Sequence, residues 1–156
     1  PEMVLLVKKI CEIIESGADF DTVVSKAELY SRHTHVVFAL SSFNNLVKNG
    51  RMSKIVGFVA NKLGFWGIGI GSEQGTIEIK QKIRGSKKAL DAIIEDMKER
   101  GYNCGKVVIS HCRNAEFAES VKSAIQSVWD KAEVKIVHAR GLCSYYAEKG
   151  GLIIGF

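Results

Sequence analysis

No uninterrupted apolar run in this sequence approaches the ~20 residues that a helix needs to cross a bilayer. The printed chain also shows no secretory signal, no low-complexity linker and no internal repeat. Its four cysteines include no C-x-x-C pair, so neither a zinc site nor a disulfide scaffold is indicated, and we expect free thiols in a reducing cytoplasm. These absences predict a single soluble domain, residues 1–156, without a bound metal or a membrane span.

The composition is that of a globular protein with one core. Hydrophobic residues make up 46% of the chain, its mean hydropathy is +0.04 and its formal net charge is +5. A chain of this length buries roughly 68–70% of its unfolded surface, which is enough to fold without a covalent staple. The cations are interleaved with acids, so we expect no nucleic-acid partner, and a basic nucleic-acid-binding module is kept only as an alternative.

Hydrophobic periodicity predicts an α/β fold, with a mixed β-sheet flanked by helices. Helices are expected over residues 3–15 and 21–31, in a short segment that ends at Lys48, over 54–63, in a segment that Ser86 caps and Gly101 ends, and over 114–129. Strands are expected over residues 36–40, 66–72, 76–83, 106–110, 133–137 and 152–156, with a turn at residues 73–75.

One arginine follows a glycine turn at the start of a predicted helix. Asn49 and Gly50 can adopt the positive φ that ends the preceding helical turn, and Ser53 is placed to cap the next helix. Arg51 and the first N–H groups of that helix could then share one acidic group. Apolar residues recur behind the cap at helical spacing: Ile55, Val56, Val59, Ala60 and Leu63. The pattern fits a site for an amphiphilic acid, or else an ordinary helix stop with a solvated arginine.

Gly67, Gly69 and Gly71 alternate along one predicted strand. They do not make a dinucleotide-binding loop, because a turn and another strand follow them instead of a helix. Alternation places all three on one face of the strand, which is therefore bare and must be covered by a helix, another backbone or a ligand chain. Of these, close helix packing is favoured.

The densest basic run lies at the end of a predicted strand and the start of the next helix. It consists of Lys80, Lys82, Arg84, Lys87 and Lys88. Such a run could bind phosphates or an acidic protein partner, or it could be a solvated edge strand and helix start. Cations at the start of a helix interact unfavourably with the helix dipole. This small cost favours a binding role for the basic run.

His111 and Cys112 adjoin the end of one predicted strand, and His138 lies at the end of another. A cysteine nucleophile needs an imidazole base nearby, and the ends of parallel strands meet at one rim. A Cys/His-based or phosphoryl-transfer enzyme is therefore an alternative, although buried or rim-lining side chains are the simpler interpretation. His33 and His35 would share one strand face, but no third ligand supports a metal, so we expect a surface pair.

Four segments, in fixed order, resemble motifs of the DegV family, bacterial proteins that bind a long-chain fatty acid. Residues 46–54 are similar to LxxGGRISK, residues 82–90 to KVRGxKKAL, residues 108–118 to VxIxHxxxxxxA, and residues 150–156 to a tail that ends GxLGIAF. The resemblance covers nearly the whole chain and corresponds to the second, C-terminal lobe of a two-lobed protein. It implies one compact α/β domain and a missing N-terminal lobe.

The resemblance implies a non-catalytic lipid-binding domain that forms half of a fatty-acid site and needs no cofactor. The expected head-group residues are Arg51, Ser53 and Tyr146. The expected acyl-chain pocket consists of Phe38, Leu40, Ile55, Val59, Phe65, Trp66 and Ile68. Family members present the bound acid to a kinase subunit, so the resemblance also implies a kinase partner. The expected docking residues are Arg84, Lys87 and Lys88.

The chain also departs from the family pattern. Tyr146 falls where the family has a histidine in a GTHTGPG-like loop, and a phenol can donate a hydrogen bond but adds no positive charge. Glu148 argues against a free anion nearby unless Lys149 or Arg140 neutralises it. Residues 65–69 replace the usual IKPIL and lack its lysine and proline. The lobe that supplies Ser and Thr hydroxyls to the head group in the family has no counterpart in this sequence.

Overall fold

The structure is a computed structural model that describes residues 1–52, 65–71 and 77–156. The predicted helix over 54–63, the predicted turn over 73–75 and the site residues Ser53, Ile55 and Val59 lie outside the described residues. The strands are β1 (Val36–Leu40), β2 (Phe65–Gly71), β3 (Ile77–Arg84), β4 (Lys106–His111), β5 (Glu133–His138) and β6 (Leu152–Gly155). The helices are α1 (Glu2–Glu15), α2 (Phe20–Arg32), α3 (Asn44–Lys48), α5 (Ser86–Glu99), α6 (Ala115–Val128) and α7 (Gly141–Ala147).

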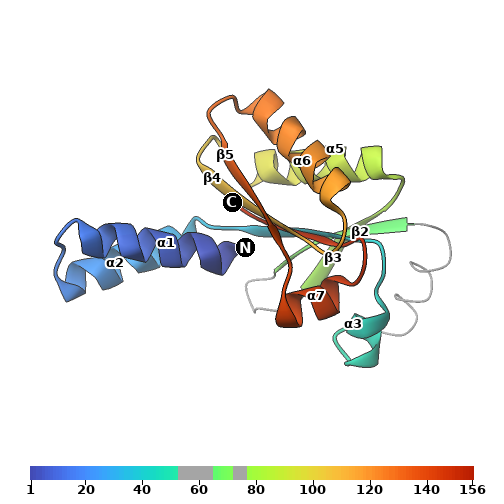
Figure 1. Cartoon of the computed structure of the whole chain (residues 1–156), viewed down its shortest axis with the longest axis horizontal. Helices are drawn as coiled ribbons and strands as arrows, with labels where there is room; N and C mark the ends of the chain where they lie inside the picture. Colours follow the sequence, from blue (N-terminus) through green and yellow to red (C-terminus); the bar gives the residue numbers. More distant parts are fainter. Residues whose placement is uncertain (53–64, 72–76) are drawn as a thin grey trace.

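The described strands form one mixed sheet in the order β3-β2-β1-β6-β4-β5 (Figure 1). Strands β4 and β5 are parallel, and the other neighbouring pairs are antiparallel. The parallel pair is joined through α6, because parallel neighbours need a crossover connection. The predicted α/β class, with a mixed sheet flanked by helices, is confirmed.

The two faces of the sheet carry two separate apolar cores. On one face, α5 and α6 cover the main core, in which Val37 and Ile68 of the sheet pack with Ile93 and Val121 of the helices. On the other face lie α3 and α7, and we call the buried group there the α3–α7 cluster. It comprises Phe38, Leu40, Phe43, Leu46 and Ala147. Residues that alternate along β1 therefore belong to different cores, as strand geometry requires.

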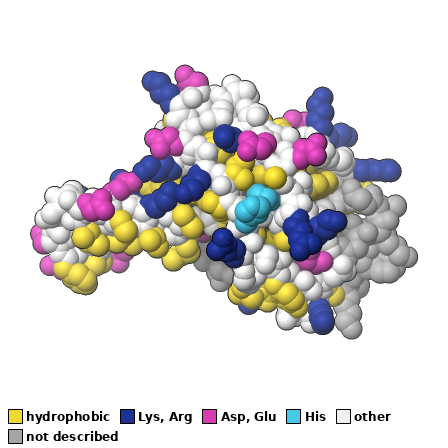
Figure 2. Space-filling model, in the orientation of Figure 1, with side chains coloured by type: hydrophobic (Ala, Val, Ile, Leu, Met, Phe, Trp, Pro, Cys, Tyr) yellow, Lys and Arg dark blue, Asp and Glu magenta, His cyan; other side chains and the backbone are white. Residues whose placement is uncertain are grey.

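Helices α1 and α2 project from the sheet as a hairpin, which we call the arm (Figure 1). Asp19 caps α2, because its Oδ1 accepts a hydrogen bond of 2.8 Å from the backbone N–H of Thr22. Leu5, only 2% exposed, anchors α1 in the rest of the protein. Along one side, however, the arm shows hydrophobic side chains to the solvent (Figure 2). The exposed apolar residues of the arm are Met3, Val4, Val7, Ile14, Phe20, Val24 and Leu29.

Within the described residues, the predicted helices and strands occur with small shifts of their ends. Helix α7 was not predicted, because the resemblance placed a loop there. The predicted cap at Ser86 is wrong: Gly85, with φ of 92°, precedes the helix and Ser86 is its first residue. Across residues 1–52, 65–71 and 77–156, none of the helices has the length and apolarity to cross a bilayer.

Among the described residues, aromatic rings lie against the glycine face of β2. The close helix packing favoured by the sequence stays a prediction, because the expected helix over 54–63 lies outside the described residues. A Cβ atom added to Gly67 would collide with the ring of Phe43, which precedes α3. A Cβ atom added to Gly69 would collide with the ring of Phe38 and with the carbonyl oxygen of Glu78. The missing side chains thus give the rings of the α3–α7 cluster room to lie against the strand.

Candidate functional site

The backbone position of Arg51 is well defined, because the turn before it has the hydrogen bonds of a Schellman motif. Gly50 has a φ of 68°, its N–H donates to the carbonyl of Val47 at 3.1 Å, and the N–H of Arg51 donates to that of Leu46 at 2.8 Å. The predicted helix stop is confirmed, with the positive φ at Gly50 alone, since Asn49 has a φ of −100°. Glycine is suited to this position because it lacks a Cβ atom.

The structure brings Arg51 to Tyr146 of α7, which is distant in the sequence. The guanidinium carbon of Arg51 lies 4.9 Å from the centre of the Tyr146 ring, within the range of a cation–π contact. Arg51 is exposed, whereas Tyr146 is half-buried and packs on the α3–α7 cluster. An exposed cation therefore lies directly beside an apolar surface.

Polar contacts tie α3 to α7 around this pair. The side-chain amide of Asn45 donates to the carbonyl of Tyr145 at 2.7 Å, and that of Asn49 donates to the Tyr145 hydroxyl at 2.8 Å. Glu148, directly after α7, accepts a hydrogen bond of 2.6 Å from the Ser42 hydroxyl and one of 2.8 Å from the backbone N–H of Asn45. Hydroxyl and amide donors therefore satisfy the Glu148 carboxylate, in place of the neutralising Lys149 or Arg140 that the sequence raised as a condition.

The expected acyl-chain residues divide between the two faces of the sheet. Phe38 and Leu40 belong to the α3–α7 cluster, on the same side as Tyr146. Alternation along β2 places Phe65 on that side too, with Gly67. Trp66 and Ile68 instead pack in the main core, where the Trp66 ring lies 4.8 Å from that of Phe117. The structure therefore does not bring Trp66 and Ile68 together with Arg51.

The three expected docking cations are exposed on one border of the protein. Arg84 ends β3, an edge strand of the sheet, and Lys87 and Lys88 lie in the first turn of α5. Lys80 differs from the rest of the predicted basic run, since its ammonium lies 3.0 Å from Asp96 and 3.4 Å from Glu99. The hydrogen bond to Asp96 raises the pKa of Lys80, so its charge is used within the protein.

The two histidines at the strand ends meet, as the parallel arrangement predicts. His111 and His138 are register partners in β4 and β5, with ring centres 4.6 Å apart. Nδ1 of His111 accepts a hydrogen bond of 3.1 Å from the N–H of Asn114, just before α6. Among the described residues, Cys112 makes its hydrogen bond to the carbonyl of Ser144, at 3.9 Å, and none to an imidazole. The geometry does not favour a cysteine nucleophile, because its base is not in contact with it.

Acid should destabilise the protein partly through His111. Burial, and then the neighbouring His138, lowers the pKa of His111 below its usual value. The folded state therefore binds fewer protons than the unfolded state below about pH 6.5, and this stability is lost as the pH falls through the lowered pKa. We expect His111→Asn, which keeps an acceptor for Asn114, to reduce the fall in melting temperature between about pH 7 and about pH 5. The measurement is thermal unfolding across this range.

Part of the slope should persist in His111→Asn, because burial lowers the pKa of His35 as well. A His111→Asn variant with the full acid sensitivity of the parent would contradict the assignment.

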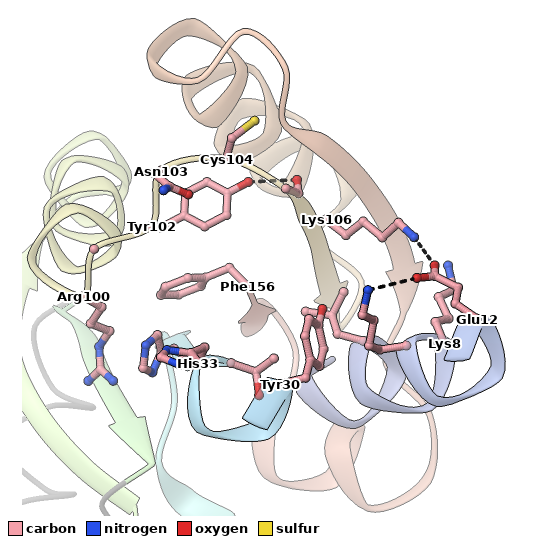
Figure 3. A pocket seen from close by; sticks show the side chains of 16 residues that line it. Lys8, Glu12, Tyr30, His33, Arg100, Tyr102, Asn103, Cys104, Lys106 and Phe156 are labelled. Atoms are coloured by element: carbon pink, nitrogen blue, oxygen red, sulfur yellow. Dashed lines mark hydrogen bonds and ion pairs between the residues drawn. The ribbon is translucent and has the colours of Figure 1, made fainter. Parts of the chain in front are cut away.

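A cavity of about 440 Å³ lies between the arm and the end of the sheet (Figure 3). Phe156 and Tyr102 face one another in it, with ring centres 5.6 Å apart, and burial raises the pKa of Tyr102 to about 12. His33 and His35 line this cavity and precede β1, so the expectation that they share a strand face is wrong. At the other end, Glu12 pairs with Lys106 and Lys9. Neither Arg51 nor Tyr146 lines this cavity.

The Arg51–Tyr146 pair and the α3–α7 cluster together can hold an amphiphilic anion. A guanidinium offers a planar fork of N–H donors to two acidic oxygens, and the adjoining apolar side chains offer contacts to a hydrophobic tail. Sequence spacing predicted the arginine and the turn. It did not predict Ser42, Asn45 and their bonds to Glu148, because these partners are about 100 positions apart in the chain.

Comparison with known proteins identifies the family of this chain. Residues 2–156 match a family model described as "Uncharacterised protein, DegV family". This chain belongs to the DegV family. It is 42% identical over 155 residues to a DegV domain-containing protein of Streptococcus pyogenes serotype M1. This match covers 99% of the chain and 55% of the relative. The chain thus spans about half the length of the curated relatives it matches.

Two solved structures of relatives hold fatty acids. The Streptococcus pneumoniae Fatty Acid Kinase (Fak) B3 protein, loaded with linoleic acid, matches with a TM-score of 0.96 and 39% identity, over 99% of this chain and 55% of that one. A DegV family protein from Eubacterium eligens, loaded with heptadecanoic acid, matches with a TM-score of 0.96 and 35% identity, over 99% and 56%. Fatty-acid binding therefore occurs in proteins that share this fold and family.

Proposed function

We propose that this chain is a non-catalytic lipid-binding domain that forms half of a long-chain fatty-acid site. The observation that carries the proposal is the Arg51 guanidinium over the Tyr146 ring, beside the α3–α7 cluster. Arg51, with Ser53 and the Tyr146 hydroxyl, binds the carboxylate. Phe38, Leu40 and Phe65, with Ile55 and Val59, contact the acyl chain. The fatty acids in the two solved relatives support this choice of ligand.

The other half of the site comes from a second lobe that packs on the arm. A tight site encloses about 70–90% of its ligand, which one face of one lobe cannot do alone. The relatives have the length for such a lobe, since this chain covers 55% of theirs. The arm has the surface for it, because its exposed apolar side chains form a contact face rather than scattered single residues (Figure 2).

An acid and an alcohol of equal chain length would test the ligand class. The natural full-length protein should bind oleic acid at least about tenfold more tightly than oleyl alcohol, because only the acid carries a charge for Arg51. Isothermal titration calorimetry with both compounds measures the difference. Equal affinities would show that the carboxylate is not recognised, and a failure of both compounds to bind would contradict the lipid site itself.

The bound acid is presented to a kinase subunit, through the cations at the border of β3 and α5. The name of the Streptococcus pneumoniae relative, a Fatty Acid Kinase (Fak) B3 protein, supports a kinase as the partner. Arg84, Lys87 and Lys88 are exposed and free to contact an acidic surface, and charges at the rim of an interface mainly speed association.

Reversing one of these charges should separate docking from lipid binding. Arg84→Glu should weaken the complex with the kinase subunit of a bacterial fatty acid kinase about tenfold, without changing fatty-acid affinity. Biolayer interferometry at low and moderate salt measures the effect. Lys131→Glu, at an exposed position after α6, makes the same charge change elsewhere. Equal losses in the two variants would indicate a general charge effect and not a docking site.

A further inference from the structure

We propose that Glu148 is a positioning residue, which holds α3 against α7 and thereby keeps Arg51 over Tyr146. The effect of Glu148 on fatty-acid binding rests on the proposed function, whereas its effect on the contact between Arg51 and Tyr146 does not. Glu148 follows α7 directly, and its N–H donates to the carbonyl of Ser144 at 3.0 Å. Its carboxylate crosses to the start of α3, so a single side chain joins the two elements of the site.

Both carboxylate oxygens of Glu148 are used. Oε1 accepts the backbone N–H of Asn45 at 2.8 Å, and Oε2 accepts the Ser42 hydroxyl at 2.6 Å and the side-chain amide of Asn44 at 3.4 Å. Bonds to an ionised acceptor are stronger than those between neutral groups. The Ser42 hydroxyl in turn accepts from the Asn44 amide at 3.0 Å. The result is a small network that fixes the first turn of α3.

The position of Glu148 is otherwise unfavourable. Its φ of 51° and ψ of 176° lie in a region of backbone space that is nearly restricted to glycine. A negative charge at the C-terminal end of a helix is also disfavoured by the helix dipole. Glutamate therefore carries two local costs that glycine would avoid. A reason for the carboxylate must lie in its contacts with the segment from Ser42 to Asn45.

The effect reaches Arg51 because α3 is short. Helix α3 has five residues, and the Schellman turn at Gly50 joins its end directly to Arg51. Tyr146 lies on the last turn of α7, two positions before Glu148. Fixing the start of α3 to the end of α7 therefore fixes the cation relative to the ring.

The test compares three substitutions in the natural full-length protein. Glu148→Gly removes the carboxylate and relieves the backbone, so the backbone gain offsets part of the lost hydrogen bonds and the protein should stay folded, which thermal unfolding checks. Glu148→Gln keeps an acceptor for Asn45 and a polar group for Ser42. Lys149→Ala, at the exposed neighbouring position, is the matched control. The probe is oleic acid, measured by calorimetry, together with NMR shifts of the Arg51 δ protons, which the Tyr146 ring current displaces.

We expect Glu148→Gly to weaken oleate binding about tenfold and to abolish the ring-current shift of Arg51 without ligand. Glu148→Gln should restore most of both, and Lys149→Ala should change neither. Adding Glu148→Gly to Arg51→Ala should cause no further loss, because Glu148 acts through Arg51. An unchanged Arg51 shift in Glu148→Gly, or additive losses in the double variant, would overturn the positioning role. If the parent fails to bind oleate, the proposed function fails, and the NMR shift alone decides the role of Glu148.

Discussion

We expect Arg51→Ala to weaken the proposed binding of a long-chain fatty acid roughly 30-fold, since a charged hydrogen-bonding partner contributes about 2 kcal/mol. The folded state should be unaffected, because Arg51 is exposed and its backbone turn depends on Gly50. Isothermal titration calorimetry on the full-length protein gives the affinity, and thermal unfolding gives the stability. This is the largest functional effect that we expect from one substitution.

Two further variants make the Arg51 result specific. Arg51→Lys keeps the charge but loses the planar fork and should bind with intermediate affinity. Lys48→Ala removes an exposed cation from the neighbouring helix α3 and should bind as the parent does. Equal affinities for the parent and Arg51→Ala would refute the assigned role, whereas equal losses in Arg51→Ala and Lys48→Ala would indicate only a general field of positive charge.

Gly69→Ala should cause the largest loss of stability, about 3 kcal/mol, because the new methyl group meets the Phe38 ring and the backbone carbonyl of Glu78. A backbone atom in an antiparallel ladder cannot move aside as a side chain can. The melting temperature should fall by about 6–12 °C, and urea unfolding should show an earlier midpoint.

Gly71→Ala is the control within the same strand. A Cβ atom there would lie 3.3 Å from Cγ1 of Val36, at an exposed position, so the loss should stay below about 1 kcal/mol. Similar losses in the two variants would mean that glycine is required in β2 for backbone reasons alone. A Gly69→Ala protein as stable as the parent would contradict the close packing of Phe38.

Local patterns in the sequence predicted the parts of the fold that depend on neighbours along the chain. The buried face of α5 follows from the spacing of Ala89, Ile93 and Met97, all of which the structure buries. The stop at Gly50 follows from the freedom of glycine to adopt a positive φ. Strand alternation correctly predicted that the glycines of β2 share one bare face. It did not identify the rings that cover this face, because Phe43 reaches it from another segment.

Local sequence patterns did not predict the contacts of the candidate site between residues that are distant along the chain. Arg51 was predicted from its turn, but its partner Tyr146 came from resemblance to the family, and its cation–π contact came from the structure. In the sequence, Glu148 argued against an anion nearby. Its hydrogen-bond donors, Ser42 and the N–H of Asn45, could not be identified there because they are distant along the chain. Hydrophobicity alone also could not separate Phe38 from Trp66, which lie on opposite faces of the sheet.

Mass spectrometry of an organic extract tests the account most directly, because it asks which molecule the protein carries when it is purified from its own cells. The natural full-length protein should release a stoichiometric amount of long-chain fatty acid, and Arg51→Ala, purified in the same way, should release much less. A parent protein that is folded and yields no fatty acid would contradict the account.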